Sequence, residues 1–280
     1  MTRAALLALG LAALATPPAS ALPSSPRRVP SRLRANRFLL IGRAPDGAEL
    51  AFWLDNDGDG FIFADVLARY RIDGADPDAF ARLLPRGEIP PPASRIPVIA
   101  RDPAEPLFAG IDGQLGVSWF AGRVVELDYR AATVNLLAAD ASRRPAMLPQ
   151  RGQTALVAGL RRRAALDTAA SVALKPAAAQ ATLGEALQAT TFISRATLNA
   201  LTAIQPDLHV YDDAGAVPGI DLVRVPELTF VAATFHNVWC TTRPNDDVFE
   251  RAAIDVKLGA NAFGDRTLVL DGTERTFAFR

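Results

Sequence analysis

Short apolar segments, separated by turn-forming residues, cover most of the chain after residue 37. Phe38–Ile41 and Glu49–Leu54 flank the dipeptide Asp46-Gly47, which is typical of a tight β-hairpin turn. Thr190–Ala203 is an exception, because its pattern indicates a short helix with Ser194 as its cap. The hydrophobic pattern therefore predicts a mostly β protein.

One pattern occurs twice along the chain. Residues 111–116 read Ile-Asp-Gly-Gln-Leu-Gly, and residues 254–259 read Ile-Asp-Val-Lys-Leu-Gly. Ile, Asp, Leu and Gly are shared by the two segments, and each segment is followed at equal spacing by Phe, Arg, Leu and Asp. Eight identities thus recur 143 positions apart: Ile111/Ile254, Asp112/Asp255, Leu115/Leu258, Gly116/Gly259, Phe120/Phe263, Arg123/Arg266, Leu127/Leu270 and Asp128/Asp271. A short apolar segment, 133–137 or 276–279, closes each copy. A repeat of this length predicts two related structural units.

The two units also begin alike. In each, an apolar segment ends in an aspartate, Asp55 after residues 52–54 and Asp167 after residues 164–166. A turn-like segment of small and polar residues follows, 56–60 in the first unit and 168–171 in the second. Each predicted unit thus presents one carboxylate directly after a strand.

The boundaries of these units follow from composition. Residues 1–21 combine a positive start, an apolar segment and the small residues Ala19-Ser20-Ala21, a pattern typical of a cleavable signal peptide. We expect a flexible lead-in over 22–36 and a linker over 141–151, because both are rich in Pro and Arg. The lobes then span 37–140 and 152–280, and the mature protein is secreted or periplasmic.

Charge and cysteine content narrow the range of functions. Lys+Arg and Asp+Glu number 30 each, so no net field attracts nucleic acid or, after signal removal, a membrane. The single cysteine, Cys240, excludes an intramolecular disulfide and lies in an apolar segment, which indicates a buried thiol. We expect a monomer.

Several motifs resemble those of the pepsin/retropepsin-like aspartic protease family, in its bilobal, secreted bacterial type. Asp167–Ser171 resembles the active-site turn, Gly113–Gly116 resembles a Gly-Ile-Leu-Gly segment, and Glu126–Tyr129 resembles a closing strand. The resemblance covers about residues 37–280. It implies two retropepsin-like lobes related by a pseudo-twofold axis, with a cleft between them.

The resemblance also implies a mechanism. Asp55 and Asp167 would form a catalytic dyad that activates water against a peptide bond of a peptide or unfolded protein, without a cofactor. Two adjacent carboxylates do not both ionise readily, so one acts as base while the other donates a proton. The resemblance assigns supporting roles in the turns to five residues: Asn56, Thr168, Ser171, Gly116 and Gly259.

Departures from the family pattern leave a second function open. Asp57 and Ala169 stand where the turn normally has glycine, and Gln114 and Lys257 stand at an apolar position. A lysine beside the dyad can pair with a carboxylate and silence it. The alternative is therefore a catalytically degenerate fold that binds peptides without cleaving them.

A third hypothesis is a secreted calcium-binding protein. Residues 55–60 match an EF-hand calcium loop at its first, third, fifth and sixth positions. The twelfth position is Val66, with Asp65 one residue early, and the preceding segment has a strand pattern. We therefore expect no metal site, with one weaker alternative set of ligands: Asp55, Asp57, Asp59 and Asp65.

Overall fold

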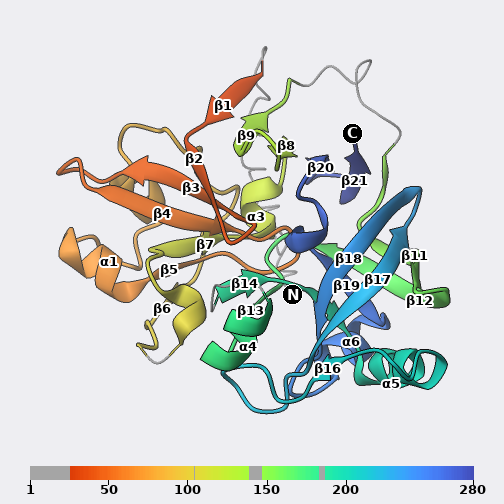
Figure 1. Ribbon diagram of the computed structural model, residues 1–280. Coiled ribbons are helices and arrows are strands. Elements are labelled where there is room, and N and C mark those ends of the chain that lie inside the picture. Colours follow the sequence, from red (N-terminus) through yellow and green to blue (C-terminus); the bar gives the residue numbers. More distant parts are fainter. Residues whose placement is uncertain (1–25, 104, 139–146, 183–186) are drawn as a thin grey trace, which may run out of the picture.

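The fold is mostly β and consists of two related lobes joined by a shared sheet (Figure 1). The computed structural model describes residues 26–103, 105–138, 147–182 and 187–280. The expected signal peptide, 1–21, and most of the expected linker, 141–146, lie outside the described residues. None of the helices in the described ranges has the length and apolar character that crossing a bilayer requires.

The N-lobe is built on a six-stranded sheet. Its strand order is β2 (Ser31–Arg34), β3 (Arg37–Arg43), β4 (Glu49–Leu54), β7 (Gly113–Leu115), β5 (Phe61–Phe63) and β6 (Val98–Ile99). β3 and β4 form the predicted hairpin, in which Gly47 takes a φ of 85° that a side chain would strain. Four short helices accompany this lobe: α1 (Ala64–Arg69), α2 (Ala79–Leu83), η1 (Pro106–Phe108) and α3 (Val117–Phe120).

The C-lobe is built on a seven-stranded sheet. Its order is β11 (Arg151–Val157), β12 (Leu160–Asp167), β19 (Val256–Gly259), β15 (Thr191–Ile193), β18 (Ala233–Thr241), β17 (Leu222–Phe230) and β16 (Val210–Tyr211). A separate pair joins β13 (Ser171–Ala173) to β14 (Leu187–Ala189). Helix α5 (Arg195–Ile204) is capped by Ser194, whose side chain accepts from Thr197 N as the sequence predicted. Residues 191–193, which were expected in this helix, form β15 instead. The other helices are α4 (Pro176–Thr182), α6 (Asp247–Ala252) and η3 (Ala260–Ala262).

The strand registers show that the lobes are copies of one unit. β4 runs parallel to β7 with Leu54 opposite Leu115, and β12 runs parallel to β19 with Leu166 opposite Leu258. β5 and β15 then lie antiparallel to β7 and β19 in their own lobes. The sequence repeat is thus a structural repeat, and the predicted two-lobed fold is confirmed.

A third sheet joins the lobes symmetrically. Its order is β1 (Arg27–Val29), β9 (Thr133–Leu136), β8 (Val124–Asp128), β20 (Thr267–Asp271), β21 (Thr276–Phe279) and β10 (Leu148–Pro149). β8 and β20 pair antiparallel at its centre, where Glu126 faces Val269, its own counterpart 143 positions later. A pseudo-twofold axis therefore passes through this pair, and the two strands lie side by side in Figure 1.

One expectation needs correction. Residues 22–36 do not form a flexible lead-in where the structure describes them, because β1 and β2 lie in this segment. β1 pairs with β9 in the shared sheet, and β2 pairs with β3 in the N-lobe. Val29 is fully buried. The Pro- and Arg-rich composition concealed two edge strands, a position in which prolines and charges are tolerated.

Candidate active site

The two aspartates occupy equivalent places in the repeated unit. Asp55 directly follows β4, and its N–H donates to Leu115 O of β7 at 3.0 Å. Asp167 ends β12 and lies opposite Gly259 of β19. In each lobe, two parallel strands thus end together and fix the position of the aspartate at the junction of the lobes.

A reciprocal set of hydrogen bonds locks the two turns together. Asn56 N donates to Thr168 Oγ1 at 3.2 Å, and Thr168 N donates to Asn56 Oδ1 at 2.7 Å. Each side chain also donates to the carbonyl before the opposite aspartate, Asn56 Nδ2 to Leu166 O at 3.2 Å and Thr168 Oγ1 to Leu54 O at 3.5 Å. Both side chains are buried. An asparagine and a threonine therefore make the same cross-lobe contacts from opposite sides.

The glycines of the repeat permit close contact behind the turns. A Cβ at Gly116 would lie 2.3 Å from Gly58 O, and a Cβ at Gly259 would lie 2.0 Å from Thr190 O. Any other residue would push β7 away from the turn 56–60, or β19 away from Thr190. Ser171 Oγ donates to Ala169 O at 3.0 Å and so closes the second turn on itself.

Asp55 is surrounded by neutral hydrogen-bond donors. Its Oδ1 accepts from Asp57 N at 2.9 Å and Gly58 N at 2.8 Å, and its Oδ2 accepts from Gln114 Nε2 at 2.9 Å. Burial, and then the negative charge of Asp167, raise the pKa of Asp55 to about 7, against the lowering effect of the backbone donors. Asp55 therefore carries a proton in mildly acidic solution.

Asp167 has a cationic partner instead. Its Oδ1 accepts from Ala169 N at 2.9 Å, and its Oδ2 lies 3.2 Å from Lys257 Nζ. Burial would lower the pKa of Lys257, but the charges of Asp167 and Asp57 outweigh it and raise that pKa. Gln114 and Lys257 are counterparts in the repeat, so each lobe uses the same position to contact Oδ2 of its own aspartate.

Asp57 extends the lysine contact across the lobes. Its Oδ2 lies 2.9 Å from Lys257 Nζ, and its Oδ1 accepts from Arg151 Nε at 2.9 Å. Arg275 Nη2 lies 3.7 Å from the same oxygen. Burial raises the pKa of Asp57, but the lysine charge and the hydrogen bonds from Lys257 and Arg151 outweigh it, so the pKa is lowered. No sequence pattern pointed to these arginines, because they lie far from Asp57 along the chain.

Both aspartates line one pocket of about 220 Å³ between the lobes. Apolar side chains from both lobes, Trp53, Phe108 and Phe192, form part of its wall. Arg243 also lines the pocket, with its guanidinium 4.9 Å from the centre of the Phe192 ring. Nothing in the sequence singled out Arg243. The arrangement offers two carboxyl groups of unlike surroundings to a ligand with an apolar character.

The acidic loop is not arranged as a calcium site. Asp55 Oδ1 accepts hydrogen bonds from backbone amides, and the carboxylate of Asp57 is paired with cations. Asp65 lies on α1, with its Oδ2 at 3.2 Å from Arg101 Nε. The Asp59 residue is exposed to solvent. In the described parts of the chain, no three His, Cys, Asp or Glu side chains gather as metal ligands. The geometry gives the calcium hypothesis no support.

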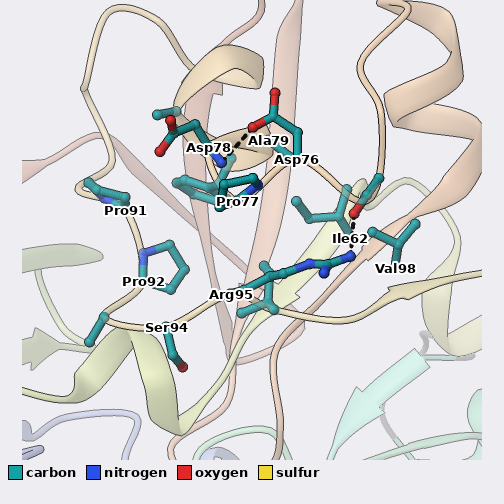
Figure 2. A pocket seen from close by; sticks show the side chains of 15 residues that line it. Ile62, Asp76, Pro77, Asp78, Ala79, Pro91, Pro92, Ser94, Arg95 and Val98 are labelled. Carbon is teal, nitrogen blue, oxygen red and sulfur yellow. Dashed lines mark hydrogen bonds between the residues drawn. The ribbon is translucent and has the colours of Figure 1, made fainter. Parts of the chain in front are cut away.

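A second pocket, of about 260 Å³, lies in the N-lobe away from the aspartates (Figure 2). It is bounded by the start of α2 and by the segment 91–98, and includes Pro77, Pro91 and Pro92. The Arg95 side chain crosses it and donates to Gly74 O at 2.7 Å. Because neither Asp55 nor Asp167 lines this pocket, it is separate from the candidate active site.

Comparison with known proteins agrees with this architecture. The chain superposes on the crystal structure of an aspartic proteinase from Irpex lacteus with a TM-score of 0.53, covering 91% of this chain and 97% of that one at 11% identity. No protein-family model matches the sequence. No curated protein matches it either. At this identity the similarity shows the fold alone: the chain has a bilobal fold similar to that of pepsin-like aspartic proteinases.

Proposed function

We propose that the protein is an aspartic endopeptidase that hydrolyses extended or unfolded peptides, with Asp55 and Asp167 as its catalytic pair. One observation carries the proposal: interlocked turns from the two lobes present both carboxyl groups to one pocket in different electrostatic surroundings. Unlike surroundings are what separate an acid from a base in such pairs.

The surroundings assign the roles. Asp55, whose pKa is raised to about 7, is the acid, and Asp167, in its ion pair with Lys257, is the base. Asp167 takes a proton from water while the water oxygen attacks the peptide carbonyl carbon, and Asp55 gives its proton to the carbonyl oxygen. The proton on Asp167 then passes to the leaving nitrogen as the C–N bond breaks, and Asp55 recovers a proton from a hydroxyl. One water is consumed, and both groups return to their starting states.

We also propose that the protein acts outside the cytoplasm, after removal of residues 1–21. The support for this location is the charge and apolar pattern of the N-terminal sequence. Immunoblotting of cell fractions, with the N-terminus of the exported form sequenced, tests the location and the cleavage site together.

Peptide binding without cleavage is the second candidate. A specific observation favours it: Oδ2 of each aspartate already has a side-chain donor, Gln114 or Lys257. These donors occupy acceptor sites that a catalytic water needs. A substrate would have to displace them, or bind above an unreactive pair.

Cleavage of a denatured, dye-quenched protein substrate across a pH series tests the leading proposal. Asp55→Asn and Asp167→Asn should each reduce the rate by about a thousandfold or more, because either change removes half of one acid–base pair. Asp59→Asn is the matched control, since it makes the same chemical change on an exposed residue of the same loop and should retain the rate. Activity that survives Asp167→Asn contradicts the mechanism. A folded wild-type protein that binds peptides but cleaves none supports the second candidate.

A further inference from the structure

A third pocket, which adjoins the pocket that holds the two aspartates, has a strongly basic lining. It measures about 390 Å³ and is lined by Asp57, Arg151, Val248, Arg251, Ala252 and Lys257. Val248 and Lys257 also line the pocket that holds the two aspartates. The two openings are therefore neighbours.

Cations outnumber anions in this opening. Three cations, Arg151, Arg251 and Lys257, line it with one carboxylate, that of Asp57. Arg151 pairs with Asp57, and Lys257 pairs with Asp57 and with Asp167 of the neighbouring pocket. The side chain of Asp57 is only 5% exposed, whereas that of Arg151 is 51% exposed. The negative charge is therefore enclosed, while positive charge remains open to solvent and to a ligand. Asp247 and Glu250 lie on the same helix as Arg251, α6, but neither lines the opening.

Arg251 has capacity for a further partner. Its Nε donates to Asp247 O at 3.2 Å, and its two Nη groups have no protein partner among the described residues. An arginine presents its donors in a planar fork that matches a carboxylate. Charge-assisted hydrogen bonds of this kind are stronger than neutral ones.

We propose that this opening is a specificity subsite that binds a carboxylate of the peptide, with Arg251 as its recognition residue and Arg151 in support. The proposal rests on the proposed function, since it assumes that peptides occupy the adjacent pocket. The carboxylate has two possible sources, an acidic side chain or the C-terminal carboxylate of the peptide. An acidic side chain makes the protein an endopeptidase with an acidic preference, whereas a chain terminus restricts it to peptide ends.

Peptide binding, measured by fluorescence anisotropy, tests the subsite independently of catalysis. The protein carries Asp55→Asn, which removes the proposed acid, while the asparagine Oδ1 can still accept from Asp57 N and Gly58 N. The probes are dye-labelled, amidated octapeptides of leucine and alanine in which one Glu occupies each position in turn. Matched probes carry Gln instead, and a third set carries Gln with a free C-terminal carboxylate.

We expect at least one Glu probe to bind about tenfold more tightly than its Gln partner, and the preference to weaken as salt is raised. A preference of this size for the free C-terminus instead identifies the chain end as the source. Arg251→Gln should remove the preference. Arg161→Gln, which removes the same charge from another exposed arginine of the C-lobe, should keep it.

Equal affinity for all three probe sets overturns the subsite, as does a preference that survives Arg251→Gln or the absence of any peptide binding. Its failure is distinct from that of the proposed function. If Asp55→Asn shows the carboxylate preference but the wild-type protein cleaves no substrate, the subsite is supported and the peptidase function is rejected. If the wild-type protein cleaves peptides but the variant shows no carboxylate preference, the peptidase function is supported and the subsite is rejected.

Discussion

Two equivalent positions, Gln114 in the N-lobe and Lys257 in the C-lobe, contact the aspartates in the same way with different charge. Each donates to Oδ2 of the aspartate of its own lobe, Gln114 at 2.9 Å and Lys257 at 3.2 Å. The backbone of the two lobes is matched in register at both positions. Side-chain differences at equivalent positions of a symmetric scaffold thus give the two carboxyl groups different electrostatic surroundings.

The third turn position completes the comparison. Asp57 in the N-lobe corresponds to Ala169 in the C-lobe, and its carboxylate reaches Lys257 across the junction. Lys257 therefore balances two carboxylates, Asp57 and Asp167, while Asp55 keeps only neutral donors. The extra acid of one lobe and the extra base of the other are parts of one buried ion cluster.

Exchanging the two donors should change the pH profile of cleavage most. Gln114→Lys places a cation beside Asp55 and lowers its pKa, so the falling limb of the profile should move to lower pH. Lys257→Gln gives the C-lobe the N-lobe residue and removes the ion-pair partner of Asp167, so the rate should fall. Each variant should lose about tenfold to a hundredfold in kcat/KM, measured against wild type across the pH series.

These exchanges also decide between the two candidate functions. Asp57 keeps Arg151 and Arg275 as partners in Lys257→Gln, so this variant retains a compensated carboxylate. A rise in cleavage after Lys257→Gln would show that the lysine silences the pair, and would contradict its role in supporting the base. Circular dichroism of both variants shows whether the fold is intact.

Breaking the cross-lobe interlock should lower stability by a smaller but measurable amount. Thr168→Val keeps the shape of the side chain but leaves Asn56 N without its acceptor and Leu54 O without its donor. Loss of these buried hydrogen bonds should reduce the free energy of unfolding by about 2–3 kcal/mol. Thr168→Ser, the matched control, retains the hydroxyl and should lose much less in urea denaturation. Equal losses in both variants would show that the interlock contributes little.

The raised pKa of Asp55 predicts an effect of the same order on stability, and this effect depends on pH. Between about pH 4, where an aspartate titrates in the unfolded chain, and about pH 7, the folded protein holds a proton that the unfolded protein has lost. The free energy of unfolding attributable to Asp55 therefore falls as the pH rises through this interval. Asp55→Asn removes this dependence and should gain several kcal/mol on wild type between pH 4 and pH 8, because each of the roughly three pKa units is worth about 1.4 kcal/mol. A difference in the free energy of unfolding between the two proteins that stays constant across this pH range would contradict the raised pKa of Asp55.

The sequence was most informative where it repeats. Eight identities at one spacing predicted two related lobes, and the aspartates that precede the turns could be matched by their position after apolar strands. The hairpin at Gly47 and the cap at Ser194 followed from local turn and capping chemistry. Such features depend on neighbouring residues, which is why a pattern reveals them.

The remaining features depend on contacts between distant segments. Arg151 and Arg275 meet Asp57 only because the lobes are joined, and Arg243 reaches the pocket from after β18. The sequence of the loop 55–60 resembles a calcium site, but Asp55 contacts backbone amides and Asp57 contacts cations. The strands β1 and β2 were missed because pairing with β9 and β3, not local composition, makes them strands.

The protonation of Asp55 is the central claim and can be measured directly. Carbon-13 NMR of the protein labelled at the aspartate carboxyl carbons follows each group through a pH titration. One resonance should titrate near pH 7, about three units above the ordinary aspartate value, and it should be absent from Asp55→Asn. If Asp55 instead titrates near pH 4, it is ionised under the proposed working conditions, and the division of the pair into acid and base is wrong.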